Sequence, residues 1–226
     1  MRTQQHVFFD LDGTVTDSKT GILNSVRHAL EQFHISRTDA ELLPFIGPPL
    51  RDSFSTLFPG DSARTAQAVA AYREYYQVRG MFENALYGGI ADLLRDLRAA
   101  GRVVCLATSK PEPYALRILE HFGIAGLFDH VAGAELHGPR NSKEAVLRHA
   151  CGLCRVRDMA RCCMVGDRKY DVLGAHAVGM ACVGVLYGYG SREELESAGV
   201  DVLCRDMAEL RALLLGEGSA QKCRAQ

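Results

Sequence analysis

Acidic residues come in close pairs at two places in this chain, each directly after an apolar run. The first pair, Asp10 and Asp12, lies in "VFFDLDGTVTDS" and is followed at once by Gly13 and Thr14. Side chains at positions i and i+2 of an extended chain point to the same side, so the two carboxylates face the same way. Like charges this close repel each other. The pair therefore indicates a site that offsets this repulsion or uses it.

The second pair, Asp167 and Asp171, follows the apolar run "CCMVG" in the segment "GDRKYD". Residues i and i+4 lie on one side of a helical turn. Two hydroxyl residues, Thr108 and Ser109, follow the run "VVCLA", and Lys143 opens a helical segment, "NSKEAV". In an open parallel sheet, ligands bind at the carboxyl ends of the strands. These groups are therefore expected at one edge of such a sheet.

That set of groups suits phosphate chemistry around a metal ion. Clustered carboxylates are stable around a divalent cation, and all-oxygen ligation suits a hard ion such as Mg²⁺. Hydroxyl groups, a lysine and backbone N–H groups at helix starts bind phosphate oxygens. Of Asp10 and Asp12, one is suited to act as nucleophile and the other as acid and base toward the same phosphoryl group. Gly13 permits the turn and the close backbone approach at this point.

The elements that position these residues alternate along the chain. Apolar runs predict strands at 7–11, 103–107, 128–132, 162–166 and 181–186, with a short one near 201–204. Most are apolar throughout, as in strands covered on both faces. Segments with helical periodicity, such as Ile90, Leu93, Leu94 and Leu97, lie between them. The pattern predicts an α/β fold with a doubly wound parallel sheet.

One interval, 19–84, contains no convincing strand. An apolar stripe from Ile22 to Phe33 predicts one helix, and a second is expected at about 63–78. Between them, "PFIGPPLRDSF" (44–54) is rich in proline and glycine and predicts a loop or tight turn. The domain boundaries that follow are a sheet core at 1–16 and 85–226 and a small all-helical domain at 17–84, inserted after the first strand.

These segments resemble the four motifs of the haloacid dehalogenase superfamily, in its phosphatase branch. "DLDGT" is similar to the first motif (DxDGT), and "LATSK" to the second, with Thr108 in the hydroxyl position. Lys143 in "NSKEAV" is similar to the third, and "GDRKYD" to the fourth (GDxxxD). The resemblance covers nearly the whole chain and includes a helical cap. Dehalogenases of the superfamily lack the second aspartate of the first motif, so Asp12 favours a phosphatase.

The resemblance implies roles for the residues that match the motifs. Asp10 would attack phosphorus and form an aspartyl-phosphate, and Asp12 would protonate the leaving oxygen and then deprotonate the attacking water. Thr108 and the Ser109 N–H would hold phosphate oxygens, with Gly13 close by. Lys143 would neutralise charge on the phosphoryl group and on the nucleophile. Lys110 and Lys169 are alternatives for this lysine, and Thr108 and Ser109 would instead be helix caps before Pro111 if no phosphate binds.

The same resemblance implies a Mg²⁺ site. Its ligands would be Asp10, the backbone carbonyl of Asp12, and Asp167. Asp171 would ligate through water or hold Lys143, although as an isolated residue it would be read as a helix cap. The implied reaction is magnesium-dependent hydrolysis of a small-molecule phosphomonoester.

The substrate depends on the cap. "FIGPPLRDSF" resembles the specificity loop of phosphoglycolate phosphatase-like and 5′-nucleotidase-like members, and Arg51 in it is a candidate for binding a substrate carboxylate or second phosphate. Many phosphoglycolate phosphatases follow the third-motif lysine with Pro-x-Pro, whereas here Lys143 is followed by "EAV". A 5′-nucleotidase-like activity is therefore favoured, with phosphoglycolate phosphatase as the alternative. A regulatory or binding protein that kept the fold but lost turnover is a further alternative, opposed by the presence of Asp10 and Asp12.

The amino-acid composition limits which other functions and binding partners the protein can have. The formal net charge is −1, from 26 basic and 27 acidic residues, without a basic cluster. No field of one sign is available to hold nucleic acid or an anionic membrane. The N-terminal segment contains no long apolar run, which favours the cytoplasm. The eight cysteines include "CGLC" and "CC", and adjacent cysteines cannot both point one way on a strand; packing thiols are favoured over a zinc site. The protein is expected to be a monomer or a homodimer.

Overall fold

The computed structural model describes residues 4–136 and 138–216. It separates into two compact units. The first holds the chain up to Val15 and again from Leu86 onward, and is called the sheet unit below. The second, Thr16–Ala85, is called the helical unit.

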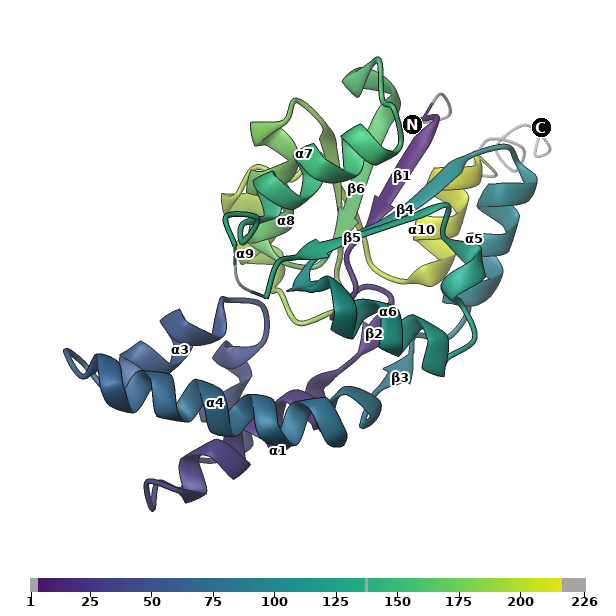
Figure 1. Ribbon diagram of the computed structural model, residues 1–226. Coiled ribbons are helices and arrows are strands. Elements are labelled where there is room, and N and C mark those ends of the chain that lie inside the picture. The colour runs from purple at the N-terminus through teal and green to yellow at the C-terminus, as the bar shows by residue number, and fades with distance from the viewer. Residues whose placement is uncertain (1–3, 137, 217–226) are drawn as a thin grey trace, which may run out of the picture. The chain divides into compact units, whose positions relative to one another are not determined.

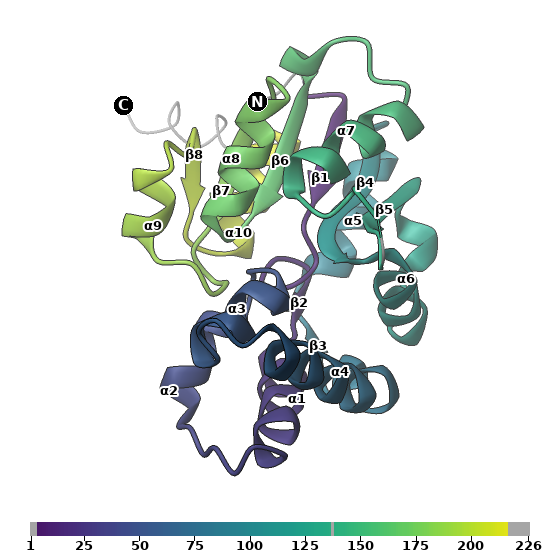
Figure 2. The same cartoon turned by 60° about the vertical axis from the view of Figure 1, so that its left-hand side comes forward.

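The sheet unit is built on six strands in the order β5-β4-β1-β6-β7-β8. Every pairing between neighbours is parallel, and in Figure 2 the sheet runs from β8 on the left to β5 on the right. The predicted α/β fold with a doubly wound parallel sheet is confirmed. The strand bounds are β1 His6–Phe9, β4 Val103–Pro111, β5 His130–Ala134, β6 Cys162–Gly166, β7 Ala181–Val185 and β8 Val202–Cys204.

Helices cover both faces of this sheet. On one face lie α7 and α8, and on the other α5 and α10 (Figure 1). The apolar stripe of α5 is wholly buried, as its periodicity predicts. The helix bounds are α5 Ile90–Ala99, α6 Glu112–His121, α7 Lys143–Leu153, α8 Lys169–Ala177, α9 Arg192–Ser197 and α10 Met207–Leu215, with 3₁₀ turns η3 Ala125–Leu127 and η4 Met159–Arg161.

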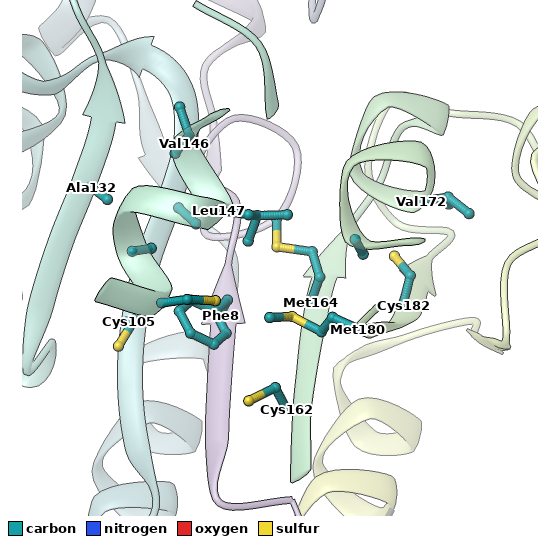
Figure 3. Packing of buried hydrophobic residues seen from close by; sticks show 14 of the residues in the cluster. Phe8, Cys105, Ala132, Val146, Leu147, Cys162, Met164, Val172, Met180 and Cys182 are labelled. Atoms are coloured by element: carbon teal, nitrogen blue, oxygen red, sulfur yellow. The ribbon is translucent and has the colours of Figure 1, made fainter. Parts of the chain in front are cut away.

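The core under α7 and α8 is formed by alternate residues of neighbouring strands. Phe8 lies level with Cys105 of β4 and with Met164 of β6, and Met164 lies level with Cys182 of β7. All four are fully buried in one hydrophobic cluster (Figure 3). Burial raises the pKa of the Cys182 thiol well above its usual value. These cysteines therefore pack as neutral, small apolar groups.

Several predicted strands have shifted boundaries, β1 and β5 among them. β1 begins at His6 and ends at Phe9 rather than extending over 7–11, so Asp10 and Asp12 follow the strand. Asp10 still continues the ladder through its N–H, which donates to Val165 O at 2.9 Å. β5 begins at His130, two residues later than predicted, because the preceding residues close the η3 turn. The sequence pattern locates strands better than it locates their ends.

The helical unit contains α1 Lys19–Glu31, α2 Asp39–Leu42, α3 Leu50–Leu57 and α4 Ser62–Val78, with 3₁₀ turns η1 Leu43–Phe45 and η2 Gly80–Phe82. Two short strands, β2 Thr16–Asp17 and β3 Ala85–Leu86, pair with each other where the chain enters and leaves this unit. Helices α1 and α4 lie side by side (Figure 1). Aromatic side chains pack together in the core of the helical unit. The Phe54 ring centroid lies 5.1 Å from that of Phe45 and 6.3 Å from that of Tyr72.

The prediction of a loop over 44–54 is wrong in its second half. Leu50–Leu57 form α3, with Pro49 immediately before its first turn. Proline is compatible with a helix start because it lacks only an N–H that would be unpaired there, and its φ is already near the helical value. Arg51 is therefore an exposed residue of the first turn of α3. No helix in the described part of the chain is long and apolar enough to cross a membrane.

Candidate active site

Neighbouring strands bring the predicted groups to the carboxyl edge of the sheet. Asp10 follows β1, Thr108 lies near the end of β4, and Asp167 follows β6. β1 pairs with β4 on one side and with β6 on the other, in parallel, so their carboxyl ends meet. Lys143 is the first residue of α7, and Asp171 lies in the first turn of α8.

Lys143 is the buried cation of this edge. Its Nζ lies 2.9 Å from Asp10 Oδ1 and 2.7 Å from Asp171 Oδ1, and it donates to Ala107 O at 3.0 Å. A lysine ammonium has three donors, and each has a partner here. Burial by itself lowers the pKa of Lys143, but Asp10 and Asp171 outweigh it and hold the pKa above its usual value. Lys143 therefore stays charged.

Asp171 uses its two oxygens for different purposes. Oδ1 pairs with Lys143, while Oδ2 accepts the Arg168 N–H at 3.0 Å and so caps α8. Burial raises the pKa of Asp171 to about 6, although Lys143 pulls it down. Gly174, one turn along α8, makes room for the lysine, because a Cβ there would lie 2.6 Å from Lys143 Cγ. Of the two roles left open for Asp171, the observed contact is the one with Lys143.

Asp167 is fully buried, and hydrogen bonds hold both of its oxygens. Oδ1 accepts from Thr14 Oγ1 at 3.3 Å, and Oδ2 accepts from the Tyr189 backbone N–H at 2.7 Å. Burial raises its pKa well above the usual value, and the nearby charges of Asp171 and Asp10 raise it further. The Tyr189 N–H and the charge of Arg168 act to lower this pKa, but they do not offset the burial.

Gly13 is required here for two separate reasons. Its φ is +81°, which favours glycine. A Cβ at this position would also collide with the carboxyl group of Asp167. The turn after β1 can therefore approach the acid of the fourth motif only with glycine at 13.

Asp10, Asp167 and Asp171 could hold a metal ion. One carboxylate oxygen from each lies within 4.8 Å of the other two, and the described residues contain no other such group of acids, histidines and cysteines. The set consists only of oxygen donors and carries unfavourable like-charge repulsion, so it fits a hard divalent cation. The Asp12 carbonyl remains a predicted ligand.

Asp12 is paired with a different lysine. Lys110 Nζ lies 2.9 Å from Asp12 Oδ2, and the Lys110 side chain is only 6% exposed. Lys143 thus contacts the Asp10 side of the site and Lys110 the Asp12 side, whereas Lys169 is exposed. The sequence presents these lysines as alternatives, because spacing does not show which carboxylate each one meets.

Thr108 and Ser109 lie in β4, which continues to Pro111 rather than ending at 107. The hydroxyl of Thr108 is buried and accepts the Lys110 N–H at 3.2 Å. Helix α6 begins at Glu112 with Pro111 as its N-cap and without a side-chain cap. The capping alternative for the two hydroxyl residues therefore does not hold. Arg51 belongs to the helical unit, and its predicted role in substrate binding stays a prediction.

The fold and the carboxyl edge define the protein class. A parallel sheet that gathers three acids, a buried lysine and hydroxyl groups at the ends of adjacent strands is the framework of an enzyme acting on phosphate esters. The chain belongs to the haloacid dehalogenase-like hydrolase family, whose model matches residues 7–185.

Similar proteins include two with phosphatase names and one named as a kinase. A 5′-nucleotidase of Pseudomonas aeruginosa is 42% identical over 212 residues, which cover 92% of this chain and 95% of that protein. Tyrosine-protein kinase PtkA of Mycobacterium tuberculosis is 45% identical over 201 residues, covering 88% of this chain and 68% of that protein. The crystal structure of a predicted phosphatase from Clostridium acetobutylicum superposes with a TM-score of 0.89 at 40% identity, covering 94% of this chain and 99% of that one. The chain is a phosphatase of this family, a phosphoric monoester hydrolase.

Proposed function

We propose that the protein is a magnesium-dependent phosphatase that hydrolyses a nucleoside 5′-monophosphate through an aspartyl-phosphate at Asp10. The observation that carries the proposal is the setting of the Asp10 carboxylate. It is held by the buried Lys143 and lies beside Asp167 and Asp171 at the carboxyl edge of the sheet. An acid in this setting is oriented by a neighbouring cation and available as a nucleophile.

The first step transfers the phosphoryl group to the protein. A carboxylate oxygen of Asp10 forms a bond to phosphorus, and the bond from phosphorus to the ester oxygen breaks. Asp12 gives its proton to that oxygen, so the product leaves as an alcohol. Asp12 Oδ1 is suited to this role because it is buried and accepts no hydrogen bond from the described residues.

The second step releases phosphate. Asp12, now a carboxylate, takes a proton from water while the water oxygen bonds to phosphorus. The bond from the Asp10 oxygen to phosphorus breaks and Asp10 leaves as a carboxylate, so inorganic phosphate is released while Asp12 keeps the proton it took from water. Thr108, the Ser109 N–H and Gly13 would hold the phosphoryl oxygens, and Lys143 would offset their charge. A divalent cation held by Asp10, Asp167 and the Asp12 carbonyl would supply further positive charge.

Two observations favour a 5′-nucleotide as the substrate. The relative at 42% identity is named 5′-nucleotidase, and Lys143 is followed by "EAV" instead of Pro-x-Pro. We assign the helical unit the role of a substrate-selecting cap, with Arg51 as its anion-binding residue. Phosphoglycolate is the alternative substrate.

A second candidate activity is phosphoryl transfer to protein tyrosine, suggested by the name of the relative at 45% identity. The phosphoryl group on Asp10 would then pass to a phenol oxygen instead of water. Water is the acceptor we favour, because the relative at 42% identity is named 5′-nucleotidase.

A substrate panel tests these alternatives. Nucleoside 5′-monophosphates, phosphoglycolate and sugar phosphates are offered with Mg²⁺, and released phosphate is measured with Asp10→Asn as the matched inactive variant. Nucleotides should give the highest kcat/KM, and EDTA should abolish turnover. Preference for phosphoglycolate would replace the nucleotidase assignment, and undiminished turnover in EDTA would refute the metal. Transfer of label from ATP to a tyrosine peptide, in place of phosphate release, would establish the kinase activity.

A further inference from the structure

The loop that follows β7 makes two hydrogen bonds to the acidic site. Tyr187 to Gly190 read "YGYG". The Tyr189 N–H donates to Asp167 Oδ2 at 2.7 Å, and the Tyr187 hydroxyl donates to Thr14 O at 3.1 Å. The loop thus binds both the turn of the first motif and the acid of the fourth, which lie more than 150 residues apart in the chain.

The two glycines of this loop are required by close approach. A Cβ on Gly188 would lie 2.6 Å from Asp167 Cγ and would also collide with Gly13 O. A Cβ on Gly190 would collide with the backbone carbonyl of Asp167. Neither glycine has a positive φ, so conformational strain does not explain them. They let the loop lie directly against Asp167.

Asp167 therefore sits in a slot with glycine on two sides. Gly13 and Gly188 each lie too close to its carboxyl group to carry a side chain. Within the slot, Thr14 holds one oxygen and the Tyr189 N–H holds the other. These two hydrogen bonds oppose the movement away from Asp171 that repulsion between the two carboxylates favours.

Tyr87, which lies outside the loop, also contacts it. The rings of Tyr187 and Tyr87 are in contact, with centroids 4.8 Å apart, and the Tyr87 N–H donates to Val15 O at 3.2 Å. The loop is thereby fixed to the segments where the chain leaves and re-enters the sheet unit. The loop is therefore held by contacts outside the slot as well as within it.

We propose that the Tyr187–Gly190 loop is a positioning element that fixes Asp167 in its metal-binding orientation before the metal arrives. This inference rests on the proposed metal-dependent function. Groups that orient a ligand without touching the metal typically change metal affinity or activity by 10–100-fold when altered. Holding the ligand in place before binding avoids the cost of ordering it during binding.

The test measures Mn²⁺ binding by electron paramagnetic resonance, independently of turnover. Gly188→Ala should raise the Kd for Mn²⁺ by about tenfold or more, because the added Cβ displaces Asp167. Tyr187→Phe, which removes only one hydroxyl group, should raise it by roughly threefold. The matched control is Gly152→Ala in α7, where an added Cβ meets nothing within 4 Å; its Kd should equal that of the wild type.

Turnover at saturating metal separates positioning from a structural role. Gly188→Ala should recover most of its kcat when Mg²⁺ is raised, with KM for substrate unchanged. A Gly188→Ala protein that is folded by circular dichroism and binds Mn²⁺ like the wild type would overturn the inference. If that variant does not fold, unchanged Mn²⁺ affinity in Tyr187→Phe overturns it instead.

The wild-type chain distinguishes this inference from the proposed function. Wild type that binds Mn²⁺ but releases no phosphate from any ester refutes the phosphatase mechanism and leaves the positioning role standing if the Gly188→Ala shift is seen. Wild type that releases phosphate but binds no Mn²⁺ refutes the positioning role.

Discussion

The two units of the protein satisfy their buried polar groups in different ways. In the helical unit, Ser25 Oγ donates to Gly21 O at 2.6 Å and Thr65 Oγ1 to Asp61 O at 2.9 Å, each one turn back along the chain. In the sheet unit, Lys143 pairs with Asp10, and Thr14 bonds Asp167, each across more than 130 positions of sequence.

The difference shows where the chemistry lies. A hydroxyl bonded to its own helix costs little and requires nothing from the rest of the fold. A buried charge is costly unless several elements supply partners for it. Among the described residues of the sheet unit, the buried carboxylates and the buried lysine lie at one edge of the sheet, which is the pattern expected of a catalytic site.

The substitution Asp10→Asn at the edge of the sheet unit should have the largest effect on the rate of hydrolysis. An amide cannot form the acyl-phosphate, so hydrolysis of p-nitrophenyl phosphate should fall by roughly 10³-fold or more. The measurement is initial rate at saturating substrate and Mg²⁺. Near-normal turnover would exclude Asp10 as the nucleophile.

Asp12→Asn should have the next largest effect. Loss of general acid and base catalysis is expected to lower kcat by about 10²–10⁴-fold. Phosphate should still bind, because Lys143, Thr108 and the backbone N–H groups are unchanged. Product inhibition by inorganic phosphate measures that affinity, and an unchanged kcat would show that proton transfer does not depend on Asp12.

Lys143→Met tests the cost of the buried charges. Removing the cation leaves Asp10 and Asp171 without their partner, and breaking a buried pair in this way costs about 3–5 kcal/mol of unfolding free energy. Urea denaturation without metal measures the loss. Arg148→Met is the matched control, since its exposed pair with Glu144 one turn away on α7 contributes little. Equal stability in the two variants would contradict a structural role for the Lys143 pair.

The same contrast explains what can be predicted from the sequence. Apolar strands and paired aspartates are local patterns, and the rule that ligands bind at the carboxyl ends of parallel strands is sufficient to place Asp10 and Asp167 at one edge. Lys110 is identifiable only as an alternative to Lys143, because its contact with Asp12 depends on how far β4 continues.

Other contacts in the structure are not indicated by any short pattern in the sequence. The "YGYG" segment lacks the glycine order of a nucleotide loop, and nothing in its residue types indicates that the Tyr189 N–H meets Asp167. In the helical unit, the prolines and the glycine of "FIGPPLRDSF" predict a loop throughout, although Pro49 opens α3. Proline marks an interruption of the chain but not whether a helix starts directly after it.

The smallest effect is expected in the helical unit, where Arg51 is exposed on α3. If this unit selects substrate without taking part in the chemistry, Arg51→Ala should raise KM for a substrate with a second anionic group by about fivefold, the size of one exposed charge contact. The kcat for p-nitrophenyl phosphate, which has no such group, should not change. Arg64→Ala on α4 is the matched control, because Arg64 is also an exposed arginine of the same unit. A fall in kcat with p-nitrophenyl phosphate for Arg51→Ala, but not for Arg64→Ala, would show that Arg51 takes part in catalysis. The assignment of substrate selection to the helical unit and of catalysis to the sheet unit would then be wrong.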